Sequence, residues 1–516
     1  MRKLPLPVVL CVLSAFLATN CFAQQSSAPP GSGGKESYFA ASFSNERKNI
    51  RDGCTRTDAT GEKPVSKYVP GCLESLFHGN KGLYGSFQDL PPGNSYALGL
   101  AFKDSELNTA SWRMNYQIDS QGSFNGSWTA GGLLTMMKSP TFKTDLNGKA
   151  RPPIVVVHGP IPKHLPNLGE NESTLVLNLY AFHTSLNQLA YYGIGNSTSV
   201  NNRALFGLRE TVTGINADKL LKYSFHLLGE INGRWPQVGS DPGHSSPSVE
   251  QVFTDMNTPG LSTQPAFLQL GEGVEFKQSV GGLHKDAALG VIADLDYAIH
   301  FQQFSAGGSA MSFRRLTIDA TNDFNLLKKF VPKNGSATSE QFGTLELRGW
   351  LVESIADAGN AVPFYFQPTL GGGDIDKERT LASYADYRFR APNAMLFRAQ
   401  YEQALPKISF LGIVVRADSG KVADARGDLD ISHMRHSYAA GLSLRAGNFP
   451  YVLIMYGWGG PESGHGFADL NLSAISPTGG AASLWWAESS PHLSTASSHV
   501  GTGAFARPPS VARSEI

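Results

Sequence analysis

Charged side chains in short alternating runs are the residues of this chain best suited to chemistry, and catalytic groups are scarce. The histidines that attract attention are His158, His433 and His436, and neither a Gly-x-Ser-x-Gly motif nor a zinc-binding motif accompanies them. A histidine without an identifiable partner is more often structural than catalytic. We therefore expect no catalytic residue, no metal site and no cofactor, and we predict that the protein is not an enzyme.

Glycines and charges gather in Val362–Arg390, which reads VPFYFQPTLGGGDIDKERTLASYADYRFR. Gly371, Gly372 and Gly373 permit positive φ and close backbone approach, so a long loop can fold back on itself. The run Tyr387-Arg388-Phe389-Arg390 alternates, and a strand there would turn both arginines toward one polar face. This chemistry is ion pairing and hydrogen bonding in a polar interior.

The elements that position these groups read as strands. Val362–Leu370 and Tyr384–Arg390 are strand-like, Arg113–Asp119 alternates apolar with polar residues, and Leu396–Glu402 does the same. No long segment has sustained helical spacing, and the 55 glycines, 29 phenylalanines and 17 tyrosines suit a turn-rich β protein. The sequence therefore predicts one large all-β unit. The long polar stretch Trp235–Thr263 reads as an exposed loop.

Composition and the N-terminal residues indicate where in the cell the protein is located. Arg2 and Lys3, an apolar stretch and the small residue Ala23 predict a signal peptide over residues 1–23. The 43 basic and 43 acidic residues balance, so we expect no nucleic-acid partner. Cys54 and Cys72 form one disulfide in an oxidising compartment or remain as two unpaired thiols.

The stretch Val362–Arg390 resembles the inward-folded loop of BamA/TamA-type outer-membrane barrels (the bacterial surface antigen family). The matching features are the Pro-Phe strand, Leu-Gly-Gly, a tetrad at Leu381-Ala382-Ser383-Tyr384, and Tyr387-Arg388-Phe389-Arg390. Further segments resemble the family's bend and later strands: Tyr191–Ser197, Ile413–Val422, Ser437–Arg445, Tyr451–Trp458 and Gly466–Ser473. The resemblance implies a transmembrane antiparallel β-barrel of about 16 strands over residues 81–473.

The tetrad departs from the family at the position that matters most. In the family its arginine pairs with carboxylates on the barrel wall, and here Ala382 and Ser383 stand where that arginine and the following glycine would be. The wall triplet has also changed, to Gln400-Tyr401-Glu402, while the strand aspartate remains as Asp418. We predict a rewired clamp in which Arg416, two positions before Asp418 and on the same strand face, or Arg379 supplies the positive charge. The alternative is an eroded motif held by the packing of Tyr384, Tyr387 and Phe389.

The termini lie outside the resemblance. Residues 24–80 read as a linker and a short N-terminal periplasmic segment, too short for the POTRA domains that assembly barrels carry. Residues 474–516 read as a low-complexity tail. The last strand ends near Ser473 or lies instead near Ala482–Glu488.

The resemblance and the signal peptide together imply the outer membrane of a Gram-negative-type cell. The activity implied is insertion or translocation of proteins, with outer-membrane lipid, client outer-membrane proteins or assembly lipoproteins as partners. The alternative is a passive channel or structural barrel that lost the assembly role.

Overall fold

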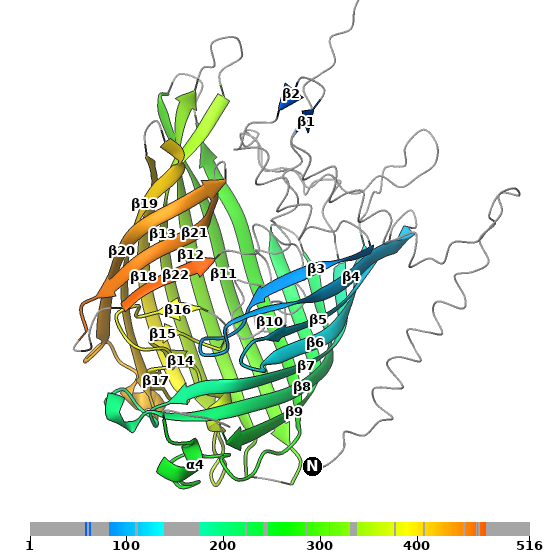
Figure 1. Cartoon of the computed structure of the whole chain (residues 1–516), viewed down its shortest axis with the longest axis vertical. Coiled ribbons are helices and arrows are strands. Elements are labelled where there is room, and N and C mark those ends of the chain that lie inside the picture. The colour runs from blue at the N-terminus through cyan, green and yellow to red at the C-terminus, as the bar shows by residue number, and fades with distance from the viewer. Residues whose placement is uncertain are drawn as a thin grey trace, which may run out of the picture.

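A computed structural model shows an all-β chain built around one large antiparallel sheet (Figure 1). The described residues are 57–58, 61–62, 82–108, 112–138, 175–221, 224–240, 246–283, 287–308, 310–330, 338–375, 378–405, 408–446, 449–460, 462 and 465–470. The signal peptide, Cys54, Cys72 and the tail lie outside them. Of residues 24–80 only two short strands are described, β1 (Thr57–Asp58) and β2 (Gly61–Glu62), which pair with each other.

The large sheet has 16 strands, each next to its neighbour in the chain. In chain order they are β3 (Gly82–Asp89), β4 (Tyr96–Asn108), β5 (Trp112–Ser123), β6 (Trp128–Lys138), β7 (Leu175–Tyr191), β8 (Ala204–Leu220), β9 (Phe225–Ser240), β10 (Phe267–Gly282), β11 (Leu289–Ala306), β12 (Phe313–Phe330), β13 (Thr338–Ile355), β18 (Asn393–Leu405), β19 (Ile408–Ala423), β20 (Arg435–Ala446), β21 (Phe449–Trp458) and β22 (His465–Leu470). The edges are β3 and β22.

Small elements lie in the connections. Between β13 and β18 runs the inward loop, residues 356–392, with two short strand pairs: β14 (Thr369–Leu370) with β17 (Phe389–Arg390), and β15 (Gly372–Gly373) with β16 (Arg379–Thr380). The helical turns are η2 (Val200–Asn202), α4 (Val249–Val252), η3 (Phe364–Phe366) and η4 (Arg426–Asp428). None of the helices among the described residues has the length and apolarity needed to cross a membrane.

Strand alternation divides the sheet into an apolar face and a polar face. On β18, Phe397 is 50% exposed whereas Arg398 is 8% exposed, as the alternation of Leu396–Glu402 predicted. The same division holds on β5, where Ile118 is 43% exposed and Asp119 is buried. An apolar outer face and a polar inner face are what a membrane-spanning β-barrel requires, and the predicted fold class is confirmed.

The sheet curves far enough for one loop to reach both of its edges. The Tyr387 hydroxyl in the inward loop donates to the Pro92 carbonyl in the β3–β4 turn at 3.1 Å. The same loop reaches the other edge of the sheet, where the Arg379 guanidinium lies 4.4 Å from the centre of the Phe467 ring in β22. One loop can touch both edges only because the sheet wraps around it, as the curved ribbons in Figure 1 show.

Three local expectations were wrong in part. Val362–Leu370 forms the turn η3 before a two-residue strand, because Pro363 and Pro368 lack the N–H that a ladder needs. The run Tyr384–Arg390 is a strand only at Phe389–Arg390, since Tyr387 has a φ of 58°. The stretch expected to be a loop from Trp235 is still β9 as far as Ser240.

The membrane-facing surface gives a first prediction. Ile299, 54% exposed near the middle of β11, is replaced by arginine. We expect a loss of about 2–4 kcal/mol in the free energy of unfolding, because a charged side chain would face the hydrocarbon. Urea titration of the protein folded in lipid vesicles measures it, with Ile299→Leu as the matched control. Equal stability of the two variants would contradict a membrane-facing position.

Candidate functional site

The three glycines let the inward loop fold tightly against its neighbours. Gly371 and Gly372 have φ of 98° and 56°, and a Cβ on Gly372 would lie 2.6 Å from the Asp386 backbone nitrogen. A Cβ on Gly373 would lie 2.5 Å from the Pro92 ring in the β3–β4 turn. These positions accept no larger side chain without a shift of the neighbours, as the sequence predicted.

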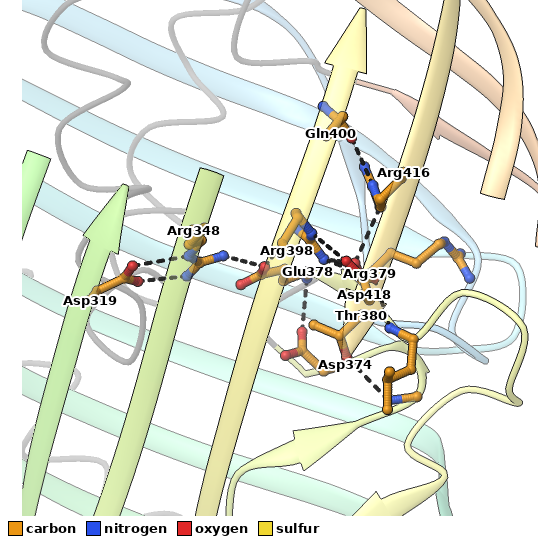
Figure 2. Close-up of polar contacts among 12 residues, drawn as sticks. Asp319, Arg348, Asp374, Glu378, Arg379, Thr380, Arg398, Gln400, Arg416 and Asp418 are labelled. Carbon is orange, nitrogen blue, oxygen red and sulfur yellow. Dashed lines mark hydrogen bonds and ion pairs between the residues drawn. The ribbon is translucent and has the colours of Figure 1, made fainter. Parts of the chain in front are cut away.

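The loop is fastened to the wall by Glu378, which lies between two arginines (Figure 2). Arg348 on β13 and Arg398 on β18 are direct cross-strand partners and both face inward. The Arg348 Nη1 and the Arg398 Nη1 both bond to the same oxygen, Glu378 Oε1, the latter at 3.0 Å. Like charges opposite each other destabilise a sheet, so the carboxylate between them stabilises loop and wall together.

Two wall aspartates hold the arginines from the outer sides (Figure 2). Asp319 on β12 accepts from the Nε and Nη2 of Arg348 at 3.0 and 2.6 Å. Asp418 on β19 accepts from the Nε of Arg398 at 2.9 Å. We call Glu378, Arg348, Arg398, Asp319 and Asp418 the charge clamp. The four wall residues lie on the neighbouring strands β12, β13, β18 and β19, and the signs alternate once Glu378 of the loop is counted between the two arginines.

The predicted clamp was right about Asp418 and wrong about its cation. Arg398 lies against Asp418, whereas Arg416 donates its Nε to Gln400 at 2.7 Å and its Nη1 to the Arg379 carbonyl at 3.3 Å. The Arg379 side chain turns instead to Asp386, 3.4 Å away. Sharing a strand face was therefore not sufficient, because a cross-strand neighbour was better placed to reach the carboxylate.

Glu402, the last residue of the wall triplet, does not take part in the clamp. It forms a buried ion pair with Arg445 on β20 and accepts from the Ser443 hydroxyl at 2.6 Å. Glu402 thus joins β18 to the wall beyond β19, one of the interactions that hold the later strands together.

The tetrad Leu381–Tyr384 is fully packed against the inner face of the later strands. The Leu381 N–H donates to Asp418 Oδ2 at 2.9 Å, and the Ser383 N–H donates to the Ser437 hydroxyl at 2.8 Å. Ala382 belongs to an apolar cluster with Val414, Ala439 and Met455. An arginine at position 382 would be placed in these apolar surroundings, so alanine suits the position.

The run Tyr387–Arg390 ties the loop to other connections. Arg388 forms an ion pair with Glu462 and donates to the Thr198 hydroxyl at 2.8 Å. Arg390 donates to the Phe364 carbonyl at 2.6 Å. Tyr384 and Phe389 pack edge to face, with ring centres 5.1 Å apart. Both arginines are buried in the docked loop rather than turned toward an open polar lumen.

A second attachment, which the sequence did not predict, is aromatic. Phe364, Tyr365 and Phe366 of η3 are buried, and we call them the aromatic anchor. Their rings meet inward-facing rings of the wall: Phe364 lies 5.0 Å from Phe206, and Phe366 lies 5.1 Å from Phe267. Aromatic pairs of this kind contribute about 0.5–1.5 kcal/mol each beyond their buried area. The loop is therefore held on two sides of the lumen.

Burial and charge act in opposite directions on Glu378. Burial raises the pKa of its carboxyl group. The positive charges of Arg348 and Arg398 lower this pKa by more than burial raises it, so the pKa lies below its ordinary value of 4.5. Glu378 is consequently charged at neutral pH. A group whose pKa is lowered by folding stabilises the folded form above its ordinary pKa, and this stabilisation is lost as the pH falls through the lowered value.

Comparisons with known proteins concern the barrel. No family model and no curated protein sequence match the chain. Among solved structures it is similar to BamA from Haemophilus ducreyi lacking POTRA domains 1–3, at 10% identity and a TM-score of 0.43 over 82% of this chain and 80% of that one. It is also similar to CdiB from Escherichia coli, at 11% identity and a TM-score of 0.43 over 75% and 61% of the two chains. CdiB from Acinetobacter baumannii gives 9% identity and a TM-score of 0.39 over 81% and 70%. Such low similarity carries no argument about activity.

The groups in this site are suited to positioning the inward loop through ion pairs and hydrogen bonds. Its groups are carboxylates, guanidiniums and backbone amides already engaged with each other, and no group of His, Cys, Asp and Glu among the described residues could hold a metal ion. The site can hold or release a loop inside the barrel.

Asp418→Asn tests the clamp. The amide would leave Arg398 without its wall carboxylate, and breaking a buried ion pair from one side costs about 3–5 kcal/mol. We expect faster trypsin cleavage after Arg379 in detergent-solubilised protein. Asp357→Asn is the matched control, because this loop carboxylate pairs with Arg314 at an exposed position. Equal cleavage in both variants would show that the clamp does not hold the loop.

The pH dependence of docking follows from Glu378. Docking should be constant from about pH 8 to about pH 5 and weaken as the pH falls below the ordinary carboxyl value. Hydrogen–deuterium exchange of residues 378–384, corrected for the intrinsic rate, measures it. Glu378→Gln serves as the comparison, because the amide side chain does not titrate in this range. Identical pH profiles for wild type and variant would rule out Glu378 as the titrating group.

Proposed function

We propose that this protein is an outer-membrane barrel that takes part in inserting or translocating polypeptides at the outer membrane. The observation that carries the proposal is the pair of edge strands. Within the described residues β3 and β22 end the sheet and do not pair with each other. An edge strand exposes backbone N–H and C=O groups that can pair with a strand from another chain.

The lengths of the edge strands support this role. β22 has 6 residues and β3 has 8, whereas the neighbouring β21 and β4 have 10 and 13. Short edges make few hydrogen bonds, so a seam between them would be the weakest pairing of the barrel. The inward loop touches both sides of this seam, through Pro92 and Phe467.

The alternative proposal is a passive channel or structural barrel. The altered tetrad favours it, since Ala382 stands where the family has arginine. The docked loop argues against an open pore, because the charge clamp and the aromatic anchor fix it to two sides of the lumen. In both proposals the role is non-covalent, and we propose no catalytic activity.

The test is photocrosslinking in intact outer membranes. A photoreactive residue replaces Gly85 in β3 or Gly466 in β22, and Gly349 in the middle of the sheet is the matched control position. We expect unfolded or nascent barrel proteins to crosslink at the two edges and not at Gly349. Recovery of assembly lipoproteins with the same material would identify partners.

Two other outcomes would contradict the proposed role. No client adducts at either edge, together with steady single-channel currents in planar bilayers, would favour the passive channel. Lipid hydrolysis by the purified protein would contradict the non-catalytic role.

A further inference from the structure

Arg348 and Arg398 are both anchored to the wall by carboxylates of the wall itself. Each guanidinium is oriented by an aspartate of an adjacent strand, Asp319 for Arg348 and Asp418 for Arg398. These contacts use the Nε side of each guanidinium, and the Nη2 of Arg398 also donates to the Arg379 carbonyl of the loop at 2.5 Å. The Nη1 of each arginine remains for a further anion. The two Nη1 atoms converge on a single point, occupied by Glu378 Oε1.

This division of roles is that of a receptor and its ligand. The wall supplies both cations and the carboxylates that aim them, and the loop supplies the anion that fills the space between them. All four wall groups are less than one-tenth exposed, so the converging donors act where charge–charge interactions are strong. A pair of like charges left without the anion would be unfavourable.

We propose that Arg348 and Arg398 form a carboxylate-binding site that the docked loop fills with its own Glu378. When the loop leaves, the site takes a carboxylate from another source. In a barrel that handles polypeptides, the source is an acidic side chain or the C-terminal carboxylate of the client; this part of the inference rests on the proposed function. The loop carboxylate and the client carboxylate then compete for one site.

The surroundings favour a carboxylate over phosphate. Asp319 and Asp418 border the pair, and Glu346 lies two residues before Arg348 on the same face of β13, opposite Gln400. These three carboxylates repel a doubly charged anion more strongly than a singly charged one. Glu346 is also the wall group best placed to compete for the arginines once Glu378 is gone.

The experiment is chemical rescue of Glu378→Ala in the full-length protein in detergent. Alanine keeps the Cβ, and acetate has the two carbons and two oxygens that the substitution removes. We expect trypsin cleavage after Arg379 to rise at least about tenfold, corresponding to about 1.4 kcal/mol. Acetate should restore protection in a saturable manner, and phosphate should be weaker.

Three controls make the result specific. Chloride at equal ionic strength should not restore protection. Asp357→Ala, in the same loop but exposed, should show no acetate effect. Glu378→Ala combined with Arg398→Lys should lose the rescue, because lysine lacks the planar fork that holds both the aspartate and the ligand. Equal effects of acetate and chloride, or no saturable effect in either Glu378→Ala or Glu378→Ala/Glu346→Gln, would overturn the proposal.

If Glu378→Ala does not fold without an anion, the yield of folded barrel replaces cleavage as the readout. Refolding in acetate should then give more heat-modifiable protein on electrophoresis than refolding in chloride, and equal yields would overturn the proposal. No client is present in these assays, so their failure is separate from failure of the crosslinking at β3 and β22.

Discussion

The structure depends on the opposition of two arginines. Arg348 and Arg398 face each other across β13 and β18, inside the barrel, and strand pairing alone would leave two like charges in contact. Glu378 resolves this conflict from a segment that belongs to neither strand. The pairing of β13 with β18 and the docking of the inward loop are thus stabilised by the same carboxylate, so disturbing one disturbs the other.

The remaining contacts of the loop fix its path across the lumen. The aromatic anchor packs against rings of the wall strands that precede the loop, such as Phe206 and Phe267. Glu378 and the tetrad lie against strands on both sides of the loop's own origin and on the last quarter of the sheet. Aromatic packing does not change with pH, whereas the charge clamp weakens when Glu378 is protonated. The two attachments therefore differ in how they can be released.

The fold was largely predictable from the sequence, and the clamp only in part. Strand alternation is a local signal, so the inward direction of Arg398 followed from Leu396–Glu402 alone. The tight fold of the loop at Gly371 and Gly372 was equally predictable, because few residues other than glycine adopt the backbone conformation found there. Pro363 and Pro368 were also visible in the sequence. Because proline lacks the backbone N–H, the strand expected over Val362–Leu370 is reduced to Thr369–Leu370.

The partners of Glu378 were not predictable in the same way. It lies in an irregular charged stretch, and its two arginines are 30 and 20 positions away along the chain. The signal that existed was the inward position of Arg348 in the alternating run 344–350, which becomes informative only once β13 is known to pair with β18. The pairing of two strands separated by a long loop depends on tertiary structure, and no local sequence pattern predicts it.

The reversed polarity of the clamp also explains the altered tetrad. In the family that this loop resembles, the long charged arm belongs to the loop and the carboxylates to the wall. Here the arms come from the wall, in Arg348 and Arg398, and the loop needs only the shorter Glu378. The tetrad is then free to approach the wall: a Cβ on Gly457 would lie 2.5 Å from the Ala382 carbonyl oxygen. Gly457 therefore lets the tetrad backbone lie directly against β21, and the Ala382 side chain packs among Val414, Ala439 and Met455, where an arginine would be buried without a carboxylate partner.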